Sequence, residues 1–414
     1  MGTGKRRGRG VMFVAWVVGA QVLAQLGAQA LPALLPGVID AWQLSKTEAG
    51  WLVGVFFVGY VAAVPVLVSL TDRLPARNVY VFGAACATIG QLGFAFVADG
   101  FWSGMVFRVF SGIGWAGNYM PGLKAIADTL EGGAQSRAVS WHAAGSGIAG
   151  ALSFAIAGLL DALAGPPAAF MFGGLAAIGS GIIAFCVMAR TSPLHARTEA
   201  PVGVSRALLD FRPILRNRLA MAWIAGYTVH TWELAALRAW SVTFLTATAV
   251  RTGAPDWLPA PTVLVTVIGL ICIGISVTGN ETAQRFGRLR VVTLAMSSAA
   301  VFAVITGWAT ALPLLLATML VLVWNACIYI DSSALTAGTV QVADKNLRGA
   351  TMGLHSMCGY TGGFLGPLGV GVFLDLAGDS PLGWGLAFGH LAIITLIGLT
   401  ILRRLGQRGM SASL

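Results

Sequence analysis

Charged residues are scarce in this sequence: Asp, Glu, Lys and Arg make up 10% of its 414 residues, whereas hydrophobic residues make up 57%. A soluble globular domain carries about a quarter of its residues as charged side chains. The composition therefore excludes an ordinary soluble protein and indicates an integral membrane protein.

Motifs that support catalysis or nucleotide binding are also missing. The sequence has no GxxxxGK[ST] loop to cradle phosphates, which excludes an ATP-driven pump. It has no HExxH or GxSxG motif and no paired carboxylates outside the apolar segments, so we expect neither an enzyme nor a bound cofactor.

Cysteine is rare, and its spacing does not suggest a metal site or a disulfide framework. We expect packing roles for the cysteines, because all five lie inside apolar segments without a CxxC motif: Cys86, Cys186, Cys272, Cys327 and Cys358. In "MGLHSMCGY", Met357 and Cys358 point away from His355 on a helix, so no metal is expected there.

Long apolar runs fill most of the chain, and each is long enough to cross a bilayer as a helix, which takes about 17 to 25 residues. They are continuous and rich in Leu, Ala, Val and Gly, unlike the alternating strands of a membrane β-barrel. The sequence thus predicts an all-α membrane protein with twelve transmembrane helices, at about 11–38, 49–71, 79–98, 101–127, 138–163, 167–189, 219–248, 258–279, 290–309, 311–338, 349–376 and 382–402.

The net charge of +10 reflects topology rather than nucleic-acid binding. In a twelve-span arrangement, Lys46 and Arg251 fall on one side of the membrane and nearly all other basic residues fall on the opposite side. Since cytoplasmic loops are rich in Lys and Arg, both termini are predicted to be cytoplasmic. The protein itself is predicted to lie in the inner (plasma) membrane of the cell. A secretory signal at "KRRGRG" is disfavoured, because its removal would leave an odd number of spans.

A polar linker at residues 190–218 divides the spans into two sets of six. We therefore predict an N-terminal six-helix bundle at 1–189 and a C-terminal six-helix bundle at 219–414. Segments 140–165 and 353–378 align at a constant offset that brings His142 onto His355 and Gly165 onto Gly378. A matched pair of histidines in membrane helices is rarely coincidental, so the two bundles are predicted to be pseudo-symmetric.

Several short motifs point to one family. The turns "VSLTDRLPARNV" and "GNETAQRFGRLRVV" follow the second and eighth predicted spans, "RVFSGIGWA" lies in the fourth, and "GGFLGPLGVG" lies in the eleventh. Over its whole length the sequence resembles the major facilitator superfamily. The motif residues that the resemblance assigns to gating or to helix interfaces are Asp72, Arg73, Arg77, Arg285 and Arg288, and the repeat-related His142 and His355 join them.

The resemblance implies a secondary transporter that works as a monomer by alternating access. Spans 1, 4, 7 and 10 would line a central cavity, and spans 2, 5, 8 and 11 would pack across the bundles. Polar residues inside the predicted spans gather in these two sets. The substrate-binding candidates among them are Gln21, Gln25, Gln29, Arg108, Asn118, Tyr119, His230, Trp232, Arg238, Asn325 and Tyr329.

Each of these candidates also has a structural alternative. Gln21, Gln25 and Gln29 recur every four residues, which places them on one helical face, yet glutamines also tie membrane helices together. Arg108 presents a fork of five donors suited to an anion, but it also matches a family motif in which the arginine is structural.

Proton coupling is expected in the seventh and tenth spans. His230 and Glu233 lie three residues apart on one helical face, and a histidine beside a carboxylate can exchange a proton near neutral pH. Glu233 is the favoured proton carrier and Arg238 is its expected cationic partner. Asp331 is either a second titrating group or the partner of Arg108 or Arg238.

Cationic side chains outnumber carboxylates inside the predicted spans, so we expect proton-coupled movement of a small organic anion or a related metabolite. A proton-antiporting exporter of a drug or hydrophobic metabolite is the alternative. A membrane sensor that does not transport is a third hypothesis, disfavoured by the short loops.

Overall fold

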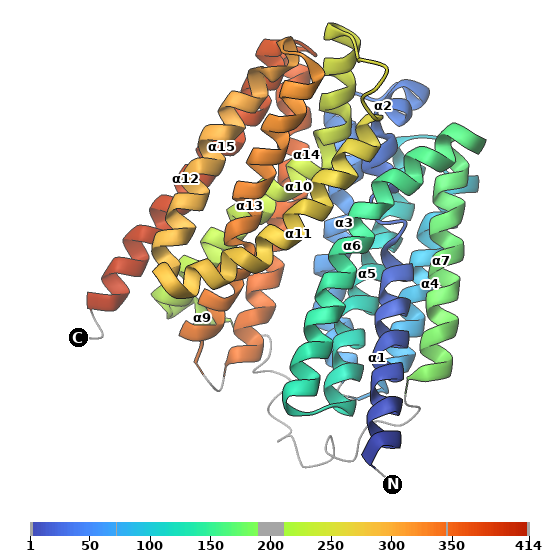
Figure 1. Ribbon diagram of the computed structural model, residues 1–414, viewed down its shortest axis with the longest axis vertical. Helices are drawn as coiled ribbons and strands as arrows, with labels where there is room; N and C mark the ends of the chain where they lie inside the picture. The colour runs from blue at the N-terminus through green and yellow to red at the C-terminus, as the bar shows by residue number, and fades with distance from the viewer. Residues whose placement is uncertain (1–2, 72, 189–210, 345–346, 412–414) are drawn as a thin grey trace. The chain divides into compact units, whose positions relative to one another are not determined.

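The computed structural model of the chain is built from helices (Figure 1). It describes residues 3–71, 73–188, 211–344 and 347–411, with the backbone alone at 3–9 and 406–411. The first helices are α1 (Thr3–Gln25), α2 (Ala30–Trp42), α3 (Lys46–Leu70), α4 (Ala76–Phe96), α5 (Phe101–Thr129), α6 (Gly132–Ala164) and α7 (Pro166–Val187). The later ones are α9 (Arg212–Arg216), α10 (Arg218–Thr252), α11 (Pro261–Phe286), α12 (Arg288–Gly307), the 3-10 helix η2 (Trp308–Ala311), α13 (Leu314–Val342), α14 (Arg348–Ala377) and α15 (Pro381–Ser411).

Ten candidate membrane spans occur in the described part of the chain, with α1 and α2 counted together as one. Helices α5 and α10 are also long enough to cross a bilayer, at 29 and 35 residues, but carry more polar residues. Each predicted apolar run thus corresponds to helical structure, in agreement with the predicted all-α membrane fold. The structure differs from the prediction in the first apolar run, where the helix is interrupted between α1 and α2.

Contacts between residues divide the chain into two compact units. Unit 1 comprises Met1–Leu34 and Val55–Glu199, and unit 2 comprises Leu35–Gly54 and Ala200–Leu414. Most of the predicted linker at 190–218 lies outside the described residues, so the predicted bundle boundaries stay a prediction. The contacts group residues 35–54 with the C-terminal helices, which sequence reasoning did not anticipate.

Glycines let the helices of unit 1 approach until their backbones touch. In the motif "RVFSGIGWA", a Cβ at Gly114 would lie 2.6 Å from the Ala87 backbone nitrogen of α4, and one at Gly112 would strike the Phe56 carbonyl of α3. A Cβ at Gly83 of α4 would likewise lie 2.6 Å from the Gly117 carbonyl carbon of α5. Small residues at such crossings strengthen packing between membrane helices. The glycines of the motif therefore let α5 pack closely against both α3 and α4.

The glycine-rich sequence of α14 does the same in unit 2. Gly362 and Gly366 face backbone carbonyls of α10, while Pro367 and Phe364 lie against α3. A Cβ at Gly50 would lie 2.6 Å from the Pro367 carbonyl oxygen, and one at Gly54 would lie 2.7 Å from that of Phe364. These contacts explain why the first part of α3 groups with unit 2.

The internal repeat is visible in how α6 and α14 end. Gly165 follows α6 with φ of 80°, and Gly378 follows α14 with φ of 76°. Both backbone N–H groups bond back to the helix, at Asp161 and Leu374. Positive φ strongly favours glycine, so the aligned glycines end equivalent helices by the same geometry.

The N-terminus of α3 is capped from two sides. Ser45 and Glu48 form a reciprocal capping box, in which the Ser45 N–H donates to Glu48 Oε2 at 2.8 Å and the Glu48 N–H donates to Ser45 Oγ at 3.1 Å. The remaining first-turn donors reach α14: the N–H groups of Lys46 and Thr47 donate to the Asp375 carboxylate at 2.8 and 2.7 Å. Helix N-termini favour such anionic acceptors.

Replacing Asp375 with alanine should destabilise unit 2, because two backbone donors of α3 would lose their acceptor. The expected loss in unfolding free energy is about 1 kcal/mol, typical of a removed N-cap. Thermal unfolding of the purified protein in detergent measures it. Asp256→Ala is the matched control, because Asp256 is an exposed carboxylate; equal melting temperatures for both variants would contradict the proposed contribution of the cap.

Candidate functional site

The helix of the first predicted span is interrupted at the glutamine stripe. Helix α1 ends at Gln25, and a turn at residues 26–29 precedes α2. The turn is held by side chains of unit 1: Gln91 Nε2 donates to the Gly27 carbonyl, and the Gln29 N–H donates to Ser153 Oγ, both at 3.0 Å. Gln29 therefore lies outside the helix that carries Gln21 and Gln25, and the three do not form one continuous stripe.

Gln25 is the centre of a buried hydrogen-bond network. With its amide oriented to suit its neighbours, Gln25 Oε1 accepts from Gln21 Nε2 at 2.6 Å and from Trp115 Nε1 at 2.8 Å. Its amide nitrogen then donates to Ser146 of α6. Helices α1, α5 and α6 thus meet through one side-chain amide.

Arg108 lies in the same region, with 3% of its surface exposed. Its guanidinium carbon lies 4.9 Å from the centre of the Phe56 ring, which in turn lies 5.0 Å from the Trp115 ring. No carboxylate of the described residues forms an ion pair with Arg108, and its Nε has no hydrogen-bond partner there. A buried cation over an aromatic face with no counter-ion is an unsatisfied charge.

The remaining polar candidates of unit 1 are packed inside the helix bundle. His142 is fully buried, the edge of its ring lies against Tyr119 with 5.1 Å between ring centres, and neither ring nitrogen has a partner among the described residues. Asn118 faces Gly83 of α4. These contacts lie among the helices of unit 1, at the crossings of α4, α5 and α6.

In unit 2, His230 of α10 lies beside Asp331 of α13. His230 Nδ1 and Asp331 Oδ1 are 2.7 Å apart, and their side chains are 2% and 3% exposed. With one added proton this pair carries no net charge; without it the pair carries one negative charge. The partner of Asp331 is thus His230 rather than Arg108 or Arg238.

Glu233 has different neighbours from those expected. One carboxylate oxygen accepts from Trp324 Nε1 at 2.6 Å and the other accepts from Thr395 Oγ1 at 2.9 Å. Both donors come from helices packed against α10, namely α13 and α15. Glu233 is 3% exposed, so its carboxylate is enclosed and hydrogen-bonded on both oxygens.

Arg238 bonds to Tyr329 rather than to a carboxylate. Its Nη2 donates to the Tyr329 hydroxyl, and its guanidinium carbon lies 5.7 Å from the centre of that ring. Nearby on the same helices, the Asn325 side-chain oxygen and the Trp232 indole nitrogen have no partner among the described residues.

His355 is linked to His230 through an aromatic ring. The Tyr227 ring stacks on His355 with 3.8 Å between ring centres and on His230 with 5.9 Å. His355 Nδ1 also lies 3.0 Å from Thr339 Oγ1. Each of the repeat-related histidines lies against a tyrosine ring, but among the described residues only His355 has a polar partner for a ring nitrogen.

The loop-motif residues lie at helix ends. Asp72 falls outside the described residues; Arg73 and Arg285 are exposed. Arg77 bonds to Asn78 Oδ1 at 3.3 Å and covers the Phe185 ring at 4.8 Å. Arg288 is half-buried at the start of α12, and its Nε and Nη1 lack partners among the described residues.

Sequence reasoning missed the aromatic and hydroxyl partners of these groups. Trp115 carried a usable signal, since it follows Arg108 by two helical turns and so shares its face. Phe56, Trp324, Thr339 and Thr395 carried none, because they come from helices whose neighbours the sequence does not specify.

The arrangement resembles known transporters. The family model of the Major Facilitator Superfamily matches residues 17–367. No curated protein sequence matches the chain.

Among solved structures, the chain is similar to a bacterial homologue of the human lysosomal transporter Spinster, in an inward-facing and occupied conformation. The TM-score is 0.76 at 13% identity, covering 95% of this chain and 96% of that one. A mutant of the nucleoside transporter NupG gives 0.73 at 14% identity, covering 95% and 99%. The human organic anion transporter MFSD10 (TETRAN) gives 0.67 at 19% identity, covering 97% and 100%.

The family match covers most of the chain, and at these identities the structural likeness establishes the fold. The chain belongs to the Major Facilitator Superfamily, and it is a membrane transporter rather than an enzyme.

Proposed function

We propose that the protein moves a small organic anion across the plasma membrane together with protons, by alternating access. The observation that carries this proposal is the buried guanidinium of Arg108, which has no ion-pair partner among the described residues. An isolated buried charge is costly, so a site that keeps one is suited to a ligand of opposite charge.

The surroundings of Arg108 favour an organic anion over a small inorganic one. Phe56 and Trp115 supply apolar ring surface next to the charge, and the Gln21–Gln25 amides supply hydrogen bonds within the same network. A carboxylate or phosphate would pair with the guanidinium fork, while an apolar body would lie on the rings. MFSD10 is described as an organic anion transporter, but at 19% identity that likeness supports the fold, so the proposal rests on these side chains.

For proton coupling we favour the His230–Asp331 pair over Glu233. Both carboxylates are buried, but Glu233 already accepts two hydrogen bonds on its two oxygens. The histidine–aspartate pair changes its net charge by one when a proton leaves, within a stacked series that continues through Tyr227 to His355. Glu233 then serves mainly to hold α10, α13 and α15 together.

Replacing Arg108 with glutamine should weaken anion binding by roughly 10- to 100-fold, because bonds to a charged group contribute about 1.5–3 kcal/mol. Thermal-shift titration with small carboxylates such as lactate, succinate and benzoate measures binding, since a ligand of the native state raises its melting temperature. Arg108→Lys should lose less, because it keeps the charge without the planar fork.

The matched control is Arg216→Gln, which removes an exposed arginine of α9. It should leave the shifts unchanged. Binding of neutral hydrophobic compounds that does not depend on Arg108, with no anion stabilising the wild type, would reject the organic-anion proposal and favour the exporter.

Replacing Asp331 with asparagine should uncouple transport from protons. Without the carboxylate, the pair can no longer change between a net charge of minus one and zero when a proton leaves or binds. The measurement is the pH inside proteoliposomes when an anion from the binding screen is added outside. Substrate-driven proton movement should disappear, while exchange of labelled for unlabelled anion continues.

Glu233→Gln supplies the contrast. It should retain proton movement and lower the melting temperature, because the amide replaces one of the two oxygens that accept hydrogen bonds from Trp324 and Thr395 with an NH2 group. If Glu233→Gln abolishes proton movement and Asp331→Asn preserves it, the carrier is Glu233 and the assignment to the pair is wrong.

A further inference from the structure

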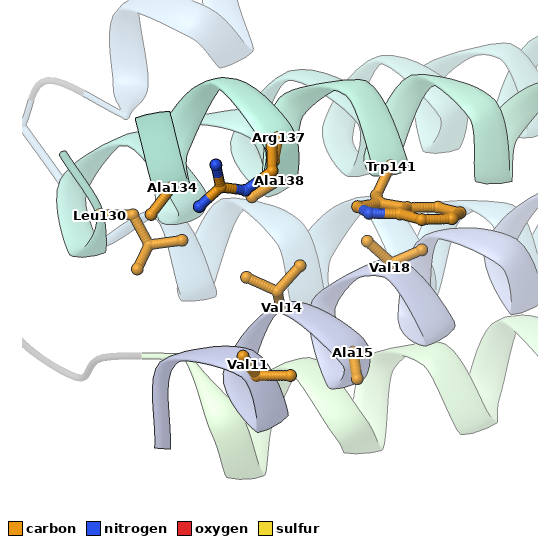
Figure 2. Close-up of a pocket in the computed structure, with 9 residues that line it drawn as sticks. All are labelled: Val11, Val14, Ala15, Val18, Leu130, Ala134, Arg137, Ala138 and Trp141. Atoms are coloured by element: carbon orange, nitrogen blue, oxygen red, sulfur yellow. The ribbon is translucent and has the colours of Figure 1, made fainter. Parts of the chain in front are cut away.

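A pocket in unit 1 lies apart from the Arg108 region, between the first part of α6 and the part of α1 beside it (Figure 2). Its cavity volume is 410 Å³. Apolar side chains form nearly all of its wall, among them Val14, Val18, Ala134 and Trp141, and Arg137 is the one charged residue that lines it.

Arg137 is an exposed cation. It forms no hydrogen bond or ion pair with any residue in the described ranges. Trp141 follows one helical turn later and is 65% exposed. Figure 2 shows the Arg137 guanidinium and the Trp141 ring projecting from α6, with Val14 and Val18 of α1 facing them.

We propose that this pocket is a binding site for an anionic phospholipid. The lipid phosphate pairs with Arg137, and an acyl chain lies along Val14 and Val18, which share a face of α1 because they are four residues apart. Trp141 lies beside the acyl chain near Val18. Basic pockets between membrane helices are suited to anionic headgroups, and tryptophan is enriched at the interface between lipid and water.

Charge is what distinguishes this pocket from other apolar grooves of the unit. A groove of 470 Å³ between α4 and α7 has a similar apolar wall, including Val81, Ala85, Ile89 and Phe185. None of its lining residues is charged, and the nearby Arg77, which lies over the Phe185 ring, already bonds to Asn78. Such a groove accepts acyl chains of any lipid. The α1–α6 pocket adds a cation at one end, so it selects the headgroup as well.

Native mass spectrometry of the delipidated full-length protein tests the proposal. The protein is titrated with phosphatidylglycerol and, separately, with phosphatidylcholine of the same acyl chains. The first phosphatidylglycerol should bind about fivefold more tightly, because its headgroup has a net negative charge whereas the ammonium group of phosphatidylcholine offsets its phosphate, and one basic residue near the membrane surface contributes about 1 kcal/mol. Arg137→Gln should remove this preference, and Arg137→Lys should retain most of it.

Two controls separate the pocket from a general effect of charge or surface. Arg290→Gln also removes an exposed arginine and should keep the preference. Ala134→Trp fills the α1–α6 pocket while leaving Arg137 in place and should abolish the preference, whereas Ala85→Trp in the α4–α7 groove should not.

Equal binding of the two lipids by the wild type, or an unchanged preference in Arg137→Gln, would overturn the proposal. So would a loss of the carboxylate-induced thermal shifts in both Arg137→Gln and Ala134→Trp, because the pocket would then belong to the path of the transported anion. The proposed anion transport does not depend on this pocket, so it stands or fails separately.

Discussion

The energetic cost of a charge in a hydrocarbon environment governs where the polar side chains of this protein lie. The membrane offers no water to solvate them, so each buried charge must find a partner inside the protein or face a wet cavity. Three different solutions occur. Glu233 accepts two hydrogen bonds, Asp331 lies against His230, and Arg108 has an aromatic face without an anion. In the proposed mechanism the first is a structural contact, the second exchanges a proton, and the third binds the anion. Functional roles follow from these differences.

Enclosure of polar groups requires helices that approach closely, and the glycines provide this. Gly112 and Gly114 bring α5 against α3 and α4, and Gly362 and Gly366 bring α14 against α10. At such distances side chains from neighbouring helices can reach the same buried amide, as Trp115 of α5 and Ser146 of α6 do at Gln25 of α1. The glycine motifs therefore act on function indirectly, because they set the distances at which the polar networks form.

The two sets of polar residues have unlike chemistry although the repeat relates their helices. In unit 1 the buried Arg108 lies beside aromatic rings and the glutamine amides, with no carboxylate paired to it among the described residues, which suits recognition of an anionic solute. Unit 2 holds the buried carboxylates Glu233 and Asp331, the second of them beside His230, which suits proton exchange, and its own Arg238 bonds to Tyr329. The proposed division of labour between substrate binding and coupling follows from this asymmetry, and it gives the variants of Arg108 and Asp331 separable effects.

The sequence by itself determined the membrane class, the apolar segments that became helices, the repeat between α6 and α14, and the family, because composition, helical length and motif spacing are local properties. It also identified most of the ionisable residues that matter, since charges within apolar segments stand out. Only the tertiary structure decided their partners. Spacing predicts that Glu233 and His230 share a helical face, but in the folded protein Glu233 bonds to Trp324 and Thr395, and His230 lies beside Asp331. The turn at residues 26–29 likewise separates Gln29 from the helix that carries Gln21 and Gln25. Helical periodicity specifies which way a side chain points along its own helix, and the neighbouring helix that it meets depends on how all the helices pack.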